Sequence, residues 1–226
     1  MTERETPSVD GLVIGILGGT GDQGRGLARR FALAGHLVII GSRSHERAHA
    51  TAQQMGQEIG PNVRGLANAD AAREADLVIA AVPWEGHGEL LSALAAELAG
   101  KIVVDCVNPL GFDQRGAYPL KVAEGSAAQQ AAALLPDSRV VAAFHHVSAI
   151  LLLDPEIDTI DLDVLVLGDD RQATDLVQAL AARIPGVRGI YAGRLRNCGQ
   201  VEALTANLVS INRRYKAHAG LRITDI

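Results

Sequence analysis

Short apolar runs alternate along this chain with longer segments in which apolar residues recur every three or four positions. The runs are rich in Val, Ile and Leu, which is typical of strands that are buried on both faces of a parallel sheet. They predict strands at residues 12–17, 37–40, 63–66, 76–82, 101–104 and 139–144. The intervening segments predict helices at residues 24–34, 45–57, 88–99 and 126–135. This alternation predicts an α/β fold built on a Rossmann-type, doubly wound parallel sheet.

The pattern changes after about residue 145. An acidic stretch around Pro155 is followed by predicted strands at residues 163–167 and 187–191, with a helix between them at residues 169–183. A long amphipathic helix is predicted at residues 198–218. Its apolar face carries Val201, Leu204, Leu208, Ile211 and Tyr215. We therefore expect a flexible lead-in at residues 1–10, a Rossmann domain at residues 11–145 and a small C-terminal α/β domain at residues 146–226.

The first predicted strand runs into a turn that contains Gly19, Gly21 and Gly24 in the spacing Gly-x-Gly-x-x-Gly. In dinucleotide-binding turns the first glycine permits a tight bend and the second lets backbone N–H groups approach a pyrophosphate. The third lets the following helix pack closely on the strand. A plain structural turn is the alternative, but the apolar strand before the turn and the helical segment after it favour a dinucleotide site.

The end of the second predicted strand indicates which dinucleotide binds. An NAD site usually has Asp or Glu there, to bind the ribose 2′-hydroxyl. This strand ends instead in Ser42 and Arg43, and Arg47 lies four residues further along. A hydroxyl and two guanidinium groups suit the 2′-phosphate of NADP, which a carboxylate would repel. The alternative is a pair of ordinary surface arginines.

A second wall of the site is expected where later strands leave the sheet at its carboxyl edge. The strand at residues 76–82 ends in Val82, followed by Pro83 and Trp84, the only tryptophan of the chain. Asn108 and Leu110 follow the next strand and face the same edge. Trp84 either covers the cofactor or packs on its own helix, and the sequence leaves both possibilities open.

Composition narrows the classes of function. The 226 residues are 48% hydrophobic and carry a formal net charge of −5, which argues against nucleic-acid binding. No apolar run is long enough for a membrane span, and residues 1–10 have no signal-peptide core. The two cysteines lack CxxC spacing, which favours a reducing cytoplasm.

Several motifs together resemble the F420-dependent NADP oxidoreductase family. They are the stretches at residues 18–24, 41–43, 82–85 and 193–197, the segment around His145, and the segment at residues 201–204. The resemblance covers nearly the whole chain after residue 11. It implies reversible hydride transfer between NADP(H) and the deazaflavin coenzyme F420, in a homodimeric enzyme.

The resemblance also implies roles for individual residues. It assigns Thr20, Gly21, Asp22 and Gln23 to the pyrophosphate, Ser42, Arg43 and Arg47 to the 2′-phosphate, and Pro83, Trp84 and Ala149 to the nicotinamide side. F420 is expected in a cleft between the large and C-terminal domains. Candidates for contacting it are Asn108, His145, Arg196 and Asn197.

No catalytic residue and no metal site are expected, because the two coenzymes carry the reactive carbons themselves. His145 and His146 are adjacent and would face opposite ways on a strand, so they are not expected to chelate one ion together. A structural hydrogen bond is the favoured role for each. Two other functions stay open: an NADP-dependent imine or ketone reductase, which would need a proton donor, and a non-catalytic NADP sensor.

Overall fold

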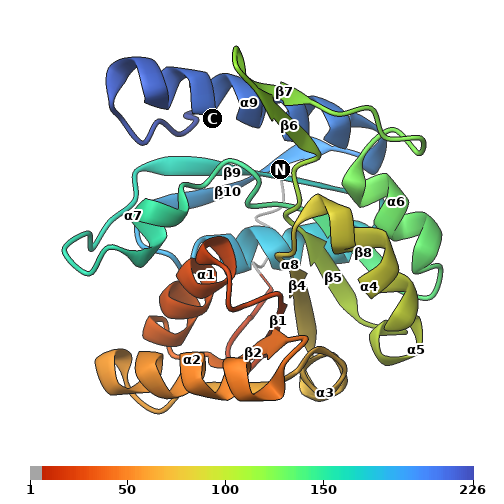
Figure 1. Cartoon of the computed structure of the whole chain (residues 1–226), viewed down its shortest axis with the longest axis vertical. Coiled ribbons are helices and arrows are strands. Elements are labelled where there is room, and N and C mark those ends of the chain that lie inside the picture. Colours follow the sequence, from red (N-terminus) through yellow and green to blue (C-terminus); the bar gives the residue numbers. More distant parts are fainter. Residues whose placement is uncertain (1–6) are drawn as a thin grey trace.

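The structure is a computed structural model that describes residues 7–226 (Figure 1). Its strands are β1 (Val13–Leu17), β2 (Leu37–Ser42), β3 (Val63–Ala67), β4 (Leu77–Ala80), β5 (Ile102–Asp105), β6 (Leu110–Asp113), β7 (Gly116–Pro119), β8 (Arg139–Ala142), β9 (Leu162–Gly168) and β10 (Val187–Gly193). In the described part of the chain they form an eight-stranded sheet in the order β10-β9-β8-β5-β4-β1-β2-β3, and a separate β6–β7 hairpin.

The six strands from β3 to β8 in this order pair in parallel, as their apolar runs predicted. The chain moves outward from β1 to β2 and β3, and then returns to place β4 on the other side of β1. Ligands bind to open α/β sheets at the carboxyl edge where this reversal occurs. The predicted Rossmann-type fold is confirmed, and the edge beyond β1 and β4 is the expected position of a site.

The helices are α1 (Asp22–Leu33), α2 (His45–Ile59), α3 (Asn68–Glu74), α4 (His87–Ala93), α5 (Ala95–Leu98), α6 (Ala127–Leu134), α7 (Ala149–Leu153), α8 (Arg171–Ala181) and α9 (Cys198–Tyr215), with 3-10 turns η1 (Trp84–Gly86) and η2 (Leu195–Asn197). One core joins the sheet to α1, α2, α7 and α8, and the other joins the opposite face to α3, α4, α5, α6 and α9. Both faces are therefore covered, which explains why the central strands β1, β4 and β5 consist mainly of buried apolar residues.

The sheet differs from a purely parallel one at β9. This strand pairs antiparallel with β8, through Val141 opposite Gly168, and β10 then pairs parallel with β9. The connection from β8 to β9 contains only the five-residue helix α7, in place of a full crossover helix, so β9 enters from the opposite end. Residues after 145 thus extend the first sheet, and their description as a separate domain stays a prediction.

Two helices and one hairpin were not expected from the sequence. They are α3, the β6–β7 hairpin and α7. The helix predicted at residues 88–99 is divided into α4 and α5. Of the predicted flexible lead-in, residues 1–6 lie outside the described residues. Val9 is only 4% exposed and Asp10 pairs with Arg183 at 3.4 Å, so the end of that segment packs against the protein.

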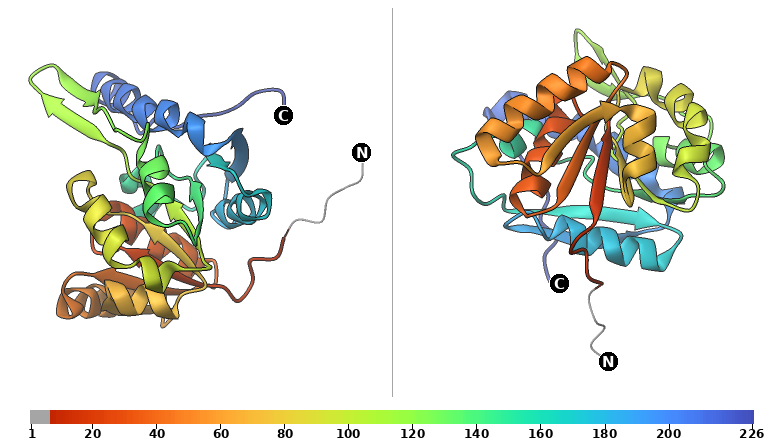
Figure 2. Two further views of the ribbon diagram at one scale, coloured as in Figure 1. Left: turned by 90° about the vertical axis from the view of Figure 1, so that its right-hand side faces the viewer. Right: turned by 90° about the horizontal axis from the view of Figure 1, so that it is seen from below.

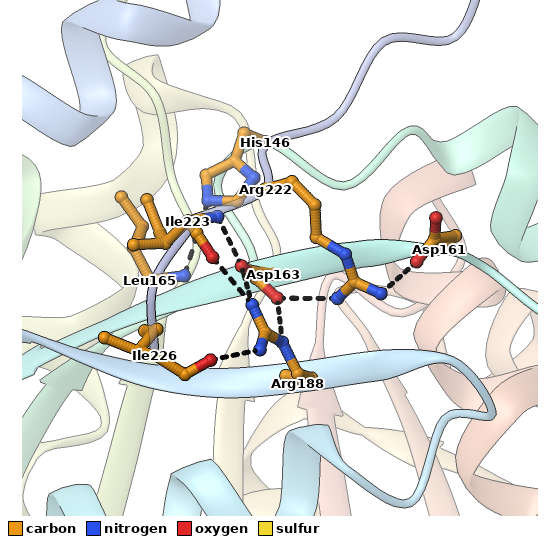
Figure 3. A network of polar contacts seen from close by, with 8 residues as sticks. All are labelled: His146, Asp161, Asp163, Leu165, Arg188, Arg222, Ile223 and Ile226. Atoms are coloured by element: carbon orange, nitrogen blue, oxygen red, sulfur yellow. Dashed lines mark hydrogen bonds and ion pairs between the residues drawn. The ribbon is translucent and has the colours of Figure 1, made fainter.

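The C-terminal tail is attached to β9 through Asp163 (Figure 3). This buried carboxylate accepts hydrogen bonds from Nε and Nη2 of Arg188, both at 2.7 Å, and from Nη1 of Arg222 at 2.8 Å. It also accepts one from the backbone N–H of Ile223 at 2.6 Å. The Arg188 guanidinium holds the pKa of Asp163 well below its usual range, so the buried group stays charged and paired.

Candidate functional site

A cleft of about 780 Å³ opens at the carboxyl edge of the sheet. Loops that follow β1, β2, β4, β5 and β8 form its walls, together with the starts of α1 to α4. The predicted residues that line it are Thr20, Gly21, Asp22, Gln23, Ser42, Arg43, Arg47, Val82, Pro83, Trp84, Asn108 and His145. Predicted residues from five separate regions of the sequence are therefore brought to one edge.

The glycine turn places the start of α1 against this cleft. A Cβ on Gly24 would lie 2.6 Å from Cα of Gly19, so the helix can approach the turn this closely only with glycine there. A Cβ on Gly21 would have Gly18 O, at 3.5 Å, as its only neighbour within 4 Å, which leaves the cleft side of that residue open. The backbone N–H groups and positive dipole end of α1 thus face a space where an anion fits.

The tip of β2 is built from side chains with different partners. Ser42 is 7% exposed and its Oγ accepts a hydrogen bond from the N–H of Ser44 at 3.3 Å. Ser44 Oγ in turn accepts from the N–H of Arg47 at 3.2 Å and caps α2. Arg43 and Arg47 are exposed, and within residues 7–226 neither side chain forms an ion pair or a hydrogen bond. Two positive charges at the cleft are therefore available to a ligand.

Trp84 lines the cleft and also packs on the helix that follows it. Its ring stacks on the ring of His87 with centroids 5.6 Å apart and an angle of 30° between the planes. The packing of Trp84 on its own helix is confirmed, and a contact of Trp84 with the cofactor stays a prediction. Asn108, from the loop after β5, donates from Nδ2 to the carbonyl oxygen of His145 at 2.8 Å and joins the opposite wall.

His145 carries two buried ring nitrogens that have no hydrogen-bond partner among the described residues. Burial lowers the pKa of its imidazole to about 4, so the ring is neutral near pH 7. The preceding Phe144 has a φ of 63°, which a bulky residue rarely adopts, and its carbonyl accepts from Gln23 Nε2 at 3.2 Å. The predicted structural hydrogen bond of the His145 ring is wrong within the described residues, and His145 lines the cleft.

His146 behaves differently from its neighbour. Its Nε2 accepts a long hydrogen bond of 3.4 Å from the N–H of Leu165 on β9, in line with a structural role (Figure 3). Burial lowers its pKa to about 4 as well. Both histidines are buried and lie in the turn that follows β8, so the expectation for a strand does not apply to them.

Gly18 and Asn68 are among the lining residues that were not predicted from the sequence. Gly18 adopts a φ of +69°, and its N–H donates to Oδ1 of Asn68 at 3.4 Å. Asn68 begins α3 directly after β3, is 6% exposed and lines the cleft. A polar amide at the end of a predicted strand was the signal that could have identified it, because all these strand ends share one edge.

The remaining predicted residues do not line the cleft. Gly24 packs closely on Gly19, as its spacing predicted, and a contact of either glycine with the cofactor stays a prediction. Leu110 begins the β6 strand, Ala149 begins α7, and Arg196 and Asn197 lie in η2. The contacts of these last four residues with a coenzyme stay predictions.

The sheet order, the glycine turn and the cationic strand tip define a Rossmann-type dinucleotide-binding protein. Residues 13–109 match the protein family described as "NADP oxidoreductase coenzyme F420-dependent". The chain is 40% identical to the F420-dependent NADP reductase of Methanothermobacter marburgensis, over 95% of this chain and 99% of the relative. It is also 40% identical to the F420-dependent NADP reductase of Methanocaldococcus jannaschii, with the same coverage.

A crystal structure from Arthrobacter, of a protein described as a candidate F420-dependent NADP reductase, superposes with a TM-score of 0.82 at 30% identity. The match covers 95% of this chain and 100% of that one. The chain belongs to the F420-dependent NADP reductase family, and the resemblance predicted from its motifs is confirmed. Among residues 7–226, no helix is both long and apolar enough to cross a membrane.

Proposed function

We propose that the chain is an oxidoreductase that transfers hydride between NADP(H) and the deazaflavin coenzyme F420. The observation that carries the proposal is one cleft that combines an open glycine turn, two arginines without protein partners and a buried histidine with two unpartnered nitrogens. Each of these groups fits a part of the expected occupants. The family relationship supplies the identity of the two coenzymes.

The first half of the cleft fits the phosphate groups of NADP. Thr20, Gly21, Asp22 and Gln23 follow β1 and present the start of α1, where backbone N–H groups bind a pyrophosphate. Arg43 and Arg47 bind the 2′-phosphate through charge-assisted hydrogen bonds, and Ser42 supports them. Because NAD has no 2′-phosphate and cannot form this contact, the arginines select NADP over NAD.

The second half of the cleft fits the nicotinamide. Val82, Pro83 and Trp84 form one wall, while Asn108 and His145 form the other. When bound, the two coenzymes supply the hydride donor and the hydride acceptor. The protein's contribution is to hold two rings in contact and to exclude water, so it requires no acid or base. His145, neutral near pH 7, is suited to hydrogen bonding with an uncharged ring substituent.

The wall that contains His145 is held in place from several sides. Gln23 donates a hydrogen bond to the backbone carbonyl oxygen of Phe144. On α9, the hydroxyl of Thr205 shares its hydrogen between Asn108 Oδ1, at 3.2 Å, and the backbone oxygen of His145, at 3.3 Å. These bonds connect the glycine turn with the C-terminal helix. We place F420 in the part of the cleft nearest α9, between residues 11–145 and the C-terminal residues 146–226.

We also propose a homodimer in the cytoplasm. On α9, Val201 and Leu208 are buried in the core, but Ile211 is 40% and Tyr215 is 74% exposed. The β6–β7 hairpin lies beside α9 (Figure 2). Its residue Phe112 is 69% exposed. These apolar side chains suit contact with a second copy. Cys106 and Cys198 are buried free thiols, which suits a reducing compartment.

The direct test mixes the purified protein with NADPH and oxidised F420 under anaerobic conditions and follows the visible absorbance of the deazaflavin. Loss of that absorbance with a matching loss of NADPH supports the proposal. Confirmed NADPH binding without any change of the deazaflavin spectrum would reject it and would favour a nucleotide sensor. Oxidation of NADPH by a cyclic imine, but not by F420, would favour an imine reductase.

A further inference from the structure

A buried polar cluster lies directly behind the cleft wall. His87, at the start of α4, and Asp105, at the end of β5, are both fully buried. His87 Nε2 lies 2.6 Å from Oδ2 of Asp105, and His87 Nδ1 lies 3.0 Å from Oε1 of Gln130 on α6. Nothing in the proposed hydride transfer uses these groups. A fully buried ion-pairing histidine is costly to maintain, so its presence calls for a role.

The hydrogen bonds of the cluster define the charge of His87. The Asp105 carboxylate is only an acceptor, and its Oδ1 accepts from the N–H of Val107 at 3.0 Å. Gln130 donates from Nε2 to Glu124 Oε2 at 3.4 Å, which directs its carbonyl oxygen towards His87. The flipped amide would set that oxygen against the Glu124 carboxylate, two acceptors facing each other. With this orientation of the amide, both imidazole nitrogens face acceptors, which favours a hydrogen on each of them.

The charges around the ring agree with this assignment. Asp105 on β5 and Glu202 on α9 are the acidic groups that act on His87, and Glu124 contacts it through Gln130. Burial lowers the pKa of His87, but the hydrogen bond and charge of Asp105 outweigh that effect, so the pKa is raised. Burial raises the pKa of Glu202 to about 7, even though it accepts hydrogen bonds from the N–H groups of Ala127 and Ala128.

The charged ring lies against the indole of the cleft wall. Trp84 and His87 stack with centroids 5.6 Å apart and planes at 30°. A cation within about 6 Å of an indole centroid is attracted to the ring face. Trp84 belongs to the short turn η1, which by itself fixes a side chain poorly, and it is only partly buried. The stack on His87 supplies a rigid backing that the turn lacks.

We propose that His87 is a positioning residue: a buried imidazolium, held by Asp105 and Gln130, that fixes the indole of Trp84 as the wall of the cleft. The inference takes this cleft as the coenzyme site of the proposed function, but its first two tests need no coenzyme. His87 does not touch the reacting atoms and acts only through Trp84.

The charge state is measured on the unaltered protein by long-range ¹H–¹⁵N correlation of the histidine side chains at pH 7. The spectrum of His87→Gln identifies the signals that belong to His87. We expect both ring nitrogens of His87 to show imidazolium shifts. A neutral tautomer, with one unprotonated ring nitrogen, would overturn the proposal.

The contact with Trp84 is measured by fluorescence, since Trp84 is the only tryptophan. A protonated imidazole quenches a stacked indole, so His87→Gln should raise the emission and the acrylamide quenching constant by about twofold or more. His36→Gln is the matched control, because His36 is also buried and lies edge-on to Phe31, away from Trp84. Unchanged emission and quenching in a folded His87→Gln protein would contradict the proposal that His87 holds the indole of Trp84.

A third measurement separates failure of this inference from failure of the proposed function. Binding of 2′,5′-ADP depends on Arg43 and Arg47, and it should be equal in the wild type and His87→Gln. Turnover with NADPH and F420 should fall about tenfold in kcat for this variant, the loss expected from one cation–π contact. Absence of 2′,5′-ADP binding by the wild type would refute the proposed function. Unchanged kcat in His87→Gln would refute the positioning role alone.

Discussion

At the level of single side chains, the cleft contains polar groups that have no partner among the described residues. Elsewhere in the described chain, charged side chains such as Arg30 and Asp163 have several partners each. Arg43, Arg47 and the ring nitrogens of His145 have none there. A buried polar atom without a partner reduces stability, whereas the two exposed arginines are solvated and free to bind an anion. Their occurrence in one cleft fits a binding site.

Replacing the two arginines tests nucleotide selection. Arg43→Ala with Arg47→Ala should weaken NADP binding by about 2–4 kcal/mol, because two charge-assisted hydrogen bonds to the 2′-phosphate are lost. NAD binding should hardly change. Calorimetric titration of both nucleotides measures the difference, and Arg115→Ala, an exposed arginine on the hairpin, serves as the control. Equal losses for NADP and NAD would contradict the assignment of the β2 tip.

Acid should destabilise the protein through His145. Its folded pKa of about 4 lies below the ordinary value of 6.5, so the unfolded chain binds more protons between these two pH values. The contribution of His145 to the free energy of unfolding is complete above pH 6.5 and is lost as the pH falls towards 4. Glu202, whose pKa is raised to about 7, acts in the opposite sense over much of this range.

Comparing His145→Asn with the wild type therefore separates the effect of His145 on the pH dependence of stability from that of Glu202. Between pH 6.5 and 4.5, His145→Asn should lose about 1–3 kcal/mol less unfolding free energy than the wild type. Urea unfolding at several pH values gives the two slopes. His49→Asn, a change of an exposed histidine on α2, should leave the wild-type slope intact. Parallel slopes for His145→Asn and the wild type would show that His145 is not held neutral.

At the level of elements, the site depends on how closely α1 approaches β1. Several glycines are required by packing, but the sequence does not distinguish them from glycines that are merely tolerated. A Cβ at Gly24 would collide with the backbone of Gly19, whereas a Cβ at Gly56, inside α2, would meet nothing within 4 Å. The same substitution should thus have opposite effects in two neighbouring helices.

Gly24→Ala should destabilise the protein and abolish nucleotide binding, because α1 must shift from the glycine turn. Gly56→Ala should stabilise it by about 0.5–1 kcal/mol, since alanine has the higher helix propensity. Thermal unfolding with and without NADP measures both effects. A Gly24→Ala protein that binds NADP normally would show that the close approach of α1 is not needed.

Elements with a strong apolar pattern were predictable, and the others were not. β1, β2, β4 and β5 are runs of buried apolar residues, and their strand ends gave most of the cleft. Helix α3 consists mainly of alanine and polar residues, so it has no distinct apolar stripe. The direction of β9 depends on a connection without a crossover helix, which periodicity does not reveal. Asn68 was missed because α3 was missed.

At the level of the whole molecule, the C-terminal segments extend the sheet and contact the wall of the cleft that contains His145. β9 and β10 extend the sheet, Asp163 ties down the tail, and Thr205 on α9 bonds to the wall that contains His145 (Figures 1 and 3). The β6–β7 hairpin lies along α9 on the same side (Figure 2). Exposed apolar residues on both elements form the surface that we assign to a second copy.

A charge placed on this surface tests the dimer. Ile211→Asp with Tyr215→Asp should convert a dimer of twice 23.7 kDa into a monomer, because apolar contact area is replaced by repelling carboxylates. Light scattering after gel filtration gives the mass. Leu33→Asp, at a 53% exposed position on α1, should leave the dimer intact. A wild-type protein that is monomeric at tens of micromolar would remove the proposal.

The most direct measurement follows isotope label from NADPH deuterated at the nicotinamide C4, with separate samples for each face, to oxidised F420 in ordinary water. The account predicts that the label from one face is recovered in full on C5 of the reduced deazaflavin, because the cleft holds the two rings in contact and excludes water. Reduced deazaflavin without label from either face, or NADPH consumption without reduction of F420, would contradict it.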